Sequence, residues 1–160
     1  MTLLNRKVDY ALLILSYLYR HSEGGSAREV AAKFELSRGF VANILKLLCH
    51  KGFVTSHRGV KGGYVLARPA DEVNLAELME ALDDSFHLAE CNKDSAASLC
   101  SHTHVCPVRG AIGEVHRRIR EVLRNVTLAE VFGDAPGGVT QFGLNLAPPE
   151  KQLVALGDAN

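Results

Sequence analysis

Two short helical patterns, followed at once by two strand-like runs, constrain this chain more than any other feature. Ser26-Ala-Arg-Glu29 is a capping box, which predicts a helix from there to about Phe34. Glu35-Leu36 then makes a tight turn, and Ser37 caps a second helix that Gly52 ends. The apolar residues that recur in the second helix at helical spacing are Phe40, Val41, Ile44, Leu45, Leu47 and Leu48. Two short helices joined by a turn of a few residues describe a helix-turn-helix.

The two strand-like runs predict a hairpin with a cationic tip. Phe53-Val-Thr-Ser-His57 and Tyr64-Val-Leu-Ala67 are joined by residues 58–63. Glycines in this connection permit positive φ angles and close backbone approach. Arg58 and Lys61 would supply charge for phosphates or for a minor groove. A hairpin directly after a helix-turn-helix makes a winged helix, so the expected fold is mainly α with a small β-hairpin wing.

The distribution of charge favours a polyanionic partner for this half of the chain. The net charge of the 160 residues is zero, but residues 1–68 carry 11 Lys and Arg against 4 Asp and Glu, a net charge of +7. Residues 69–160 carry the remaining 7 against 14, a net charge of −7. A basic half suits a nucleic acid. The candidate DNA-binding residues are Arg38, Gly39, Asn43, Lys46, Arg58, Gly59 and Lys61. An ordinary solvated helix face is the alternative for those on the second helix.

An apolar helix is expected before the helix-turn-helix, from about Arg6 to Arg20. Its side chains are apolar around most of the circumference, so it should be buried on several sides. Asp9 is its one acid. On the residues alone, the helix dipole is the better explanation for this carboxylate, because it favours negative charge in the first turn.

Three cysteines lie within sixteen residues, at Cys91, Cys100 and Cys106. Neither helix nor strand periodicity gives this segment a face to bury, so we expect a loop that a metal centre holds. A disulfide framework is disfavoured because no secretory signal is evident and cytosolic thiols stay reduced. Structural zinc usually takes two ligands two to four residues apart, whereas the gaps here are eight and five residues. Unligated cysteines remain an alternative, and Cys49 in the second helix is interpreted as a packing residue.

The second half of the chain predicts further helices. Asn74-Leu-Ala-Glu77 caps a short helix that ends near Asp83-Asp84, and Pro107 suits the start of a long one. The long helix has apolar residues at three-four spacing: Val108, Ala111, Ile112, Val115, Ile119, Val122, Leu123 and Val126. This stripe exceeds what one small winged helix covers, which favours pairing with a second copy. Thr127-Leu-Ala-Glu130 starts a further short helical turn, and glycine and proline from Asp134 indicate a loose tail.

These patterns divide the chain into four parts. We expect a winged helix-turn-helix DNA-binding domain over 1–84, a cysteine loop over 85–106, a dimerisation helix with a short cap helix over 107–132, and a flexible tail over 133–160. No apolar run approaches the ~20 residues of a membrane span, and a cytoplasmic location is expected. No nucleophile–base pair, phosphate-binding loop or second cofactor motif is evident, which argues against an enzyme or electron carrier.

Three features together resemble the Rrf2 family of bacterial transcription regulators over about residues 1–132. They are the run from Ser37 through Leu48 with Gly52-Phe-Val, the wing Arg58-Gly-Val-Lys-Gly-Gly-Tyr-Val-Leu-Ala-Arg68, and the three later cysteines. The resemblance implies a homodimeric winged-helix repressor or activator that binds double-stranded operator DNA. It also implies that an iron–sulfur cluster controls this binding in response to nitric oxide, redox state, or iron or cluster supply.

The resemblance also implies cluster ligands, of which Cys91, Cys100 and Cys106 are the first three. In the housekeeping cluster regulators of the family a His lies three residues after the last Cys, but that position here is Arg109. Asp9 matches the position just before the Tyr-Ala of the first helix, where nitric-oxide-sensing members supply an Asp from the partner subunit. A [4Fe-4S] cluster is therefore favoured over [2Fe-2S]. Two alternatives stay open: His102 or His104 as the fourth ligand, and a winged-helix regulator with structural zinc or no metal.

Overall fold

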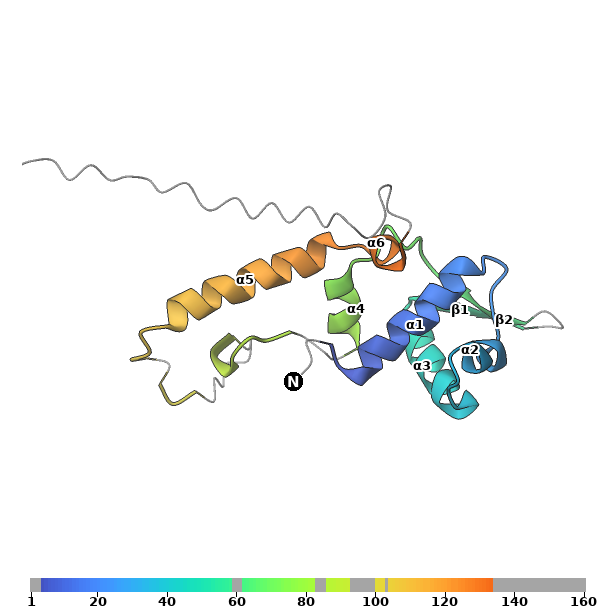
Figure 1. Cartoon of the computed structure of the whole chain (residues 1–160), viewed down its shortest axis with the longest axis horizontal. Coiled ribbons are helices and arrows are strands. Elements are labelled where there is room, and N and C mark those ends of the chain that lie inside the picture. Colours follow the sequence, from blue (N-terminus) through green and yellow to red (C-terminus); the bar gives the residue numbers. More distant parts are fainter. Residues whose placement is uncertain (1–3, 59–61, 83–85, 93–99, 103, 134–160) are drawn as a thin grey trace, which may run out of the picture.

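The computed structural model describes residues 4–58, 62–82, 86–92, 100–102 and 104–133 (Figure 1). In chain order its elements are α1 (Arg6–Arg20), α2 (Ala27–Lys33), α3 (Arg38–His50), β1 (Val54–His57), β2 (Gly63–Leu66), α4 (Leu75–Ala81), the 3-10 helix η1 (Glu90–Asn92), α5 (Arg109–Asn125) and α6 (Leu128–Phe132). The two strands form one antiparallel hairpin. The predicted fold class, mainly α with a small β-hairpin wing, is confirmed.

Helix α1 supplies the largest share of the core of the amino-terminal half. The side chain of Asn5 caps it by accepting a hydrogen bond from the Val8 N–H at 3.0 Å. One face is fully buried and consists of Val8, Ala11, Ile14, Leu15 and Leu18. This face packs against α3 and β2. On the opposite side the Leu13 side chain is 39% exposed, so burial within one copy covers only part of the apolar circumference.

The capping residues expected for the helix-turn-helix are present. Ser26 accepts a hydrogen bond from the Glu29 N–H, and the Glu29 carboxylate accepts one from the Ser26 N–H. Ser37 accepts a hydrogen bond from the Phe40 N–H at 3.2 Å and so starts α3. In the turn between the helices Glu35 adopts a left-handed φ of 54°. These contacts fix where α2 and α3 begin.

A glycine ends α3 and turns the chain into the wing. Gly52 has a φ of 79°, and the Phe53 N–H donates to the Leu48 carbonyl at 3.0 Å, which is the bonding of a Schellman cap. The Gly52 N–H also donates to the Cys49 carbonyl at 3.1 Å. The helix therefore stops where the sequence predicts, and β1 begins two residues later.

The wing is anchored to the segment between α1 and α2. Val54 pairs with Leu66 across the hairpin, and Gly25 exchanges two backbone hydrogen bonds with Tyr64 at 3.0 and 2.9 Å. A Cβ atom on Gly24, which has a φ of 91°, would lie 2.8 Å from the Tyr64 carbonyl oxygen. Only glycine fits this crossing. The base of the wing is thus fixed against the helix-turn-helix.

Backbone hydrogen bonds join the start of helix α4 to the start of helix α6. The Asn74 side chain caps α4 by accepting from the Glu77 N–H at 2.9 Å. The Leu75 N–H donates to the Val126 carbonyl at 2.9 Å, and the Leu128 N–H donates to the Val73 carbonyl at 2.8 Å. Helix α4 ends at Ala81. The expected end near residues 83–84 lies outside the described residues.

The carboxyl end of the described chain returns to α1. The Arg20 guanidinium donates to the Phe132 carbonyl at 3.2 Å, and the rings of Tyr19 and Phe132 lie 5.4 Å apart. Helix α6 is therefore joined to the winged helix, which fixes the carboxyl end of α5 against the body.

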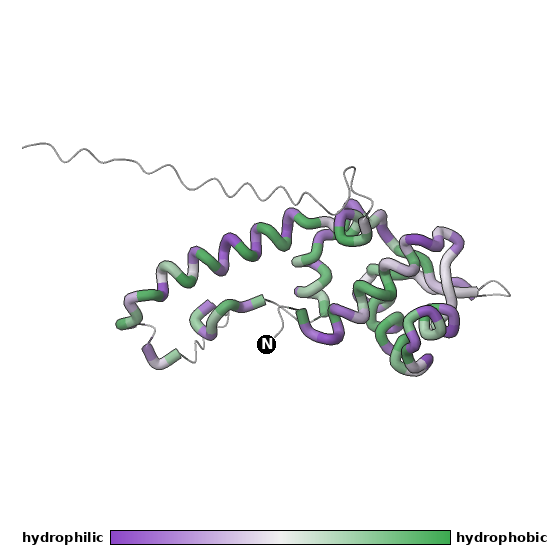
Figure 2. Tube along the Cα trace, viewed as in Figure 1, coloured by the Kyte–Doolittle hydropathy of each residue, from purple (hydrophilic) through white to green (hydrophobic). Residues whose placement is uncertain are grey.

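Helix α5 extends away from the rest of the molecule (Figure 1), and hydrophobic and hydrophilic residues alternate along it (Figure 2). It begins at Arg109, two residues after Pro107. Val108 is the N-cap residue. The helix contacts α4 and η1, and Arg120 pairs with Glu80 of α4 at 2.9 Å. Among the described helices none is long and apolar enough to cross a membrane.

Candidate nucleic-acid interface and metal centre

The polar face of α3 is open to solvent. Gly39, Asn43 and Lys46 are exposed and recur at spacings of four and three, so they share one side of the helix. Arg38 is exposed at the start of the same helix. His50 is also exposed and continues the row four residues after Lys46. Sequence analysis missed His50, although its spacing from Asn43 and Lys46 could have identified it.

Gly39 lies on this face without a packing reason inside the chain. A Cβ atom built on Gly39 would meet no atom of the described structure within 4 Å. Glycine in a helix costs about 0.5 to 1 kcal/mol relative to alanine, because the unfolded chain gains freedom. The described part of the chain offers nothing that offsets this cost. Packing within the described chain therefore does not require glycine at this position.

The wing presents polar side chains beside this helix. Thr55, Ser56 and His57 of β1 are exposed, and Arg58 follows them with an exposed side chain. The two other predicted wing contacts, at positions 59 and 61, lie outside the described residues. Arg68 is engaged elsewhere, because it pairs with Glu77 and its guanidinium lies 5.8 Å from the centre of the Phe53 ring.

The structure does not bring the three loop cysteines together. Cys91 is in η1, whereas Cys100 and Cys106 lie outside helices, strands and turns, and all three are partly buried. All four cysteines of the chain are described, and none forms a disulfide. Within the described residues no group of three or more His, Cys, Asp and Glu side chains is close enough to hold a metal ion. Residues 93–99 and 103 of the loop lie outside the described part.

The donor chemistry nevertheless fits iron. Thiols of partly buried cysteines in a loop are the ligands that iron–sulfur clusters use. Cys49 differs, because it packs against the core from α3 and burial raises the pKa of its thiol. A raised pKa disfavours the thiolate that a metal needs. The cysteine set thus separates into three ligand candidates and one packing residue.

The candidates for the fourth ligand are spread over the surface. Asp9 is exposed in the first turn of α1, where its N–H donates to the Asn5 carbonyl at 3.0 Å. His102 and His104 are exposed in the turns of the loop. Arg109, which stands three residues after the last Cys and is not a ligand candidate, is the first residue of α5.

A histidine that sequence analysis did not single out attaches the loop to α5. His116 is the only buried polar or charged residue in the described part of the chain, with 8% of its surface exposed. Its ring stacks with those of Phe86 and His87 at 5.5 and 6.0 Å, and its Nδ1 accepts a hydrogen bond from the Leu88 N–H at 3.4 Å. A histidine within the apolar stripe, three residues before Ile119, was the available signal.

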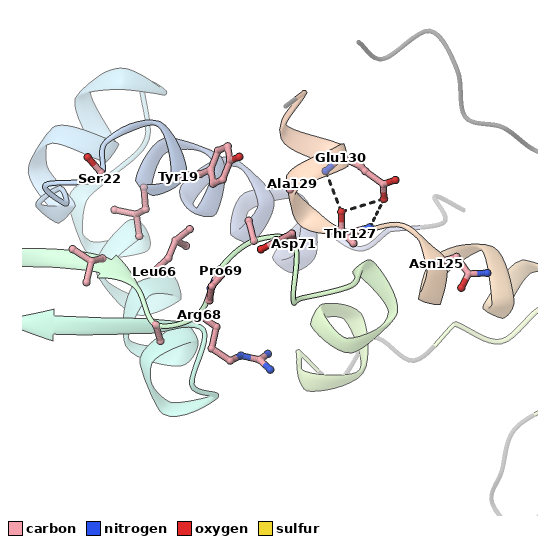
Figure 3. Close-up of a pocket in the computed structure, with 14 residues that line it drawn as sticks. Tyr19, Ser22, Leu66, Arg68, Pro69, Asp71, Asn125, Thr127, Ala129 and Glu130 are labelled. Atoms are coloured by element: carbon pink, nitrogen blue, oxygen red, sulfur yellow. Dashed lines mark hydrogen bonds between the residues drawn. The ribbon is translucent and has the colours of Figure 1, made fainter. Parts of the chain in front are cut away.

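A separate cleft of about 850 Å³ opens between the end of α1, the exit of β2 and α6 (Figure 3). Tyr19, Leu66 and Ala129 contribute to its walls, and Thr127 and Glu130 are held there by the capping bonds of α6. None of the predicted DNA-binding or metal-binding residues in the described part of the chain lines this cleft.

Comparison with known proteins places these features in a family. Protein aau3 of Rhizobium meliloti (strain 1021) is 30% identical over 134 residues, which are 83% of this chain and 86% of that protein. The HTH-type transcriptional regulator NsrR of Bacillus subtilis (strain 168) is 26% identical over 130 residues, 80% of this chain and 88% of that protein.

Solved structures share the fold. T. potens IscR matches with a TM-score of 0.62 and 25% identity, covering 82% of this chain and 86% of that one. CymR, the global cysteine regulator of B. subtilis, matches with a TM-score of 0.66 and 23% identity, covering 84% of this chain and 99% of that one. The likeness to CymR concerns the fold alone. The model of the Rrf2 family, described as an iron-dependent transcriptional regulator, matches residues 4–134. The chain therefore belongs to the Rrf2 family of winged-helix transcription regulators.

Proposed function

We propose that the protein is a homodimeric bacterial regulator whose affinity for operator DNA is controlled by an iron–sulfur cluster. The observation that carries the DNA-binding part is the open polar face of α3. A transcription regulator of this family needs an element that enters a groove, and a helix with an exposed polar row beside a wing suits the major groove.

The predicted contacts divide into two kinds. Arg38, Gly39, Asn43 and Lys46 lie on α3, where they would face base edges. Arg58, with Gly59 and Lys61 at the wing tip, would contact phosphates or the minor groove. Replacing Asn43 by Ala should relax discrimination at one operator position by about 1 to 3 kcal/mol, whereas binding to unrelated DNA should stay unchanged. Competition gel shifts with single-base operator variants measure this difference.

Pairing of two chains is supported by the apolar side of α5 that this chain leaves uncovered. Val108, Val115 and Val122 are 56%, 45% and 39% exposed. They are spaced by seven residues, so they form one line along the helix. A second copy that covers this line would place two α3 helices for the two half-sites of an operator.

The proposed cluster ligands are Cys91, Cys100 and Cys106 of one chain and Asp9 of the partner subunit. A bound [4Fe-4S] cluster, favoured over [2Fe-2S], would supply a centre that reacts with nitric oxide or oxidants and is lost when iron is scarce. The chain's own part is to hold the three thiols in a loop between α4 and α5. A cluster bound in this loop would set the angle between the two winged helices of the dimer. The cluster alters DNA affinity only by the difference between its stability in the DNA-binding arrangement of the dimer and its stability in the other arrangement.

Two measurements test the proposal. Anaerobically purified protein should show broad absorbance near roughly 400 nm from thiolate-bound iron. Replacing any one of the three loop cysteines by Ala should abolish this absorbance. Gel shifts of reconstituted and metal-free protein on its own promoter should then give different affinities. Equal affinities of the two forms would remove the cluster from control of DNA binding.

A winged-helix regulator that holds zinc or no metal is the second candidate. The absence, among the described residues, of a convergent group of metal ligands favours the metal-free form, because it counts against zinc as much as against a cluster. Stoichiometric zinc without visible absorbance would support the zinc form, and neither metal nor absorbance would support the metal-free form.

A further inference from the structure

Helix α5 has two adjacent faces, one buried against the chain and one exposed. The first, here called the inner face, consists of Ile112, His116, Ile119 and Leu123, and the residues on it are partly or fully buried. The second, the outer face, consists of Val108, Ala111, Val115 and Val122, and its three valines are 39% or more exposed. The inner face packs against α4 and η1. A shift of either face must therefore move the other, because both belong to one helix.

His116 is the point at which the inner face meets the segment that carries Cys91. Its ring lies nearly parallel to those of Phe86 and His87, at interplanar angles of 18° and 15°. The Leu88 N–H donates to Nδ1, so Nδ1 is an acceptor and the proton of the neutral ring is on Nε2. A buried imidazole costs free energy unless such partners are present. Segment 86–92 is thus the partner that makes burial of His116 tolerable.

The rest of segment 86–92 follows the same helix. A Cβ atom on Gly113 of α5 would lie 3.9 Å from the Asn92 side-chain nitrogen, so the Asn92 side chain lies close to the helix at that level. His87 in turn contacts the Asn92 carbonyl oxygen through Nδ1 at 3.2 Å. The Asn92 Oδ1 atom, one residue after Cys91, is buried and lacks a hydrogen-bond partner in the described structure.

We propose that His116 is the positioning residue that couples the cysteine loop to the dimerisation helix. By holding residues 86–88 on α5 it fixes the approach of Cys91, and any rearrangement of Cys91 on cluster binding reaches the outer face through the same ring. This inference rests on the proposed function, because it specifies how that regulation is transmitted. His116 itself is not a ligand in this proposal.

Two substitutions separate the two kinds of contact. His116→Phe keeps a ring for stacking and removes the Nδ1 acceptor, whereas His116→Asn keeps an acceptor near the Nδ1 position and removes the ring. His21→Phe is the matched control, because His21 also stacks on a neighbouring ring, that of Tyr17 at 4.0 Å, and contacts a backbone oxygen through Nδ1. His21 is exposed at the end of α1, remote in sequence from the loop.

The first readout is the ratio of operator affinities between cluster-loaded and metal-free protein. Coupling between two sites commonly amounts to about 5- to 150-fold. In both His116 variants this ratio should fall towards one, whereas the His21 variant should keep the parental ratio. The circular dichroism of the bound cluster should also change in the His116 variants. A residue that only stabilises the fold would lower the melting temperature and leave the ratio intact.

The second readout is hydrogen exchange of the Leu88 amide in metal-free protein, which does not need the cluster. Protection in the parent and its loss in His116→Phe are expected. An unprotected Leu88 amide in the parent overturns the proposal even where the variants fail to fold. A parent that binds DNA equally with and without the cluster refutes the proposed function. A responsive parent with an equally responsive His116→Phe variant refutes the role of His116 alone.

Discussion

Replacing Gly39 by Ala should stabilise the protein and weaken its binding to DNA. Gly39 is the second residue of α3, and a Cβ atom there meets nothing within 4 Å of the described chain. Alanine is a better helix former than glycine, so the free energy of unfolding should rise by about 0.5 to 1 kcal/mol. For a chain of this size that gain corresponds to a melting temperature about 1 to 4 °C higher.

The loss on DNA follows from the same open space. If DNA occupies the space beside Gly39, an added methyl group has to displace the helix or the DNA. Extra methyl groups in well-packed contacts typically cost about 1 to 3 kcal/mol. That range corresponds to about a 5- to 150-fold weaker operator affinity.

The chain contains a matched control. Gly110 is the second residue of α5 and also follows an arginine, and a Cβ atom added there likewise meets nothing within 4 Å in the described structure. Gly110→Ala should raise the melting temperature by a similar amount and leave DNA affinity unchanged. Thermal denaturation and fluorescence anisotropy with labelled operator, on metal-free and loaded protein, measure both quantities. A Gly39→Ala variant that is stabilised like Gly110→Ala and binds operator like the parent would refute the close approach.

Further substitutions test three other parts of the proposal. Arg58→Ala should weaken binding to all DNA sequences alike and reduce the slope of log affinity against log salt by about one; an unchanged slope would exclude a phosphate contact. Val122→Glu should give a folded monomer in sedimentation. Ile119→Glu, on the half-buried inner face, should lower the free energy of unfolding by several kcal/mol and unfold the chain. A stable Val122→Glu dimer would place the interface elsewhere. Asp9→Ala should leave a cluster that assembles weakly and has an altered spectrum, because an oxygen ligand is lost, whereas Cys49→Ala should keep the parental spectrum. An unaltered Asp9→Ala spectrum, together with a change in a His102→Ala variant, would place the fourth ligand in the loop.

Most of the fold follows from local signals in the sequence. Capping residues and glycines act over a few residues, and they locate the ends of α2 and α3 because their bonds are made within one turn. The start of α5 was less well predicted. Pro107 is tolerated in a first turn, but it is equally tolerated just before one, and local rules do not separate the two positions.

The candidate site was predictable only where one element carries it. The exposed row on α3 follows from periodicity, because a single helix decides which side chains share a face. The contacts of His116 with Phe86 and Leu88 join residues 28 or more positions apart. No spacing rule connects such residues. The sequence therefore identified the cysteines of the loop and missed the histidine that attaches the loop to α5.

The apolar stripe of α5 explains why regulation could be built into this helix. From the sequence the stripe is a single broad face, and periodicity does not tell which residues pack within the chain and which are left for a partner. The structure separates it, because Leu123 is buried at 7% exposure whereas its neighbour Val122 is 39% exposed. Adjacent residues of one helix thus face the chain's own body and the solvent, where the proposed second copy would bind. A rigid helix with the loop on one face and the proposed second copy on the other would transmit a small change at the loop to the dimer interface. This requires that the free energy of the contacts between loop and helix differs between the two arrangements of the dimer.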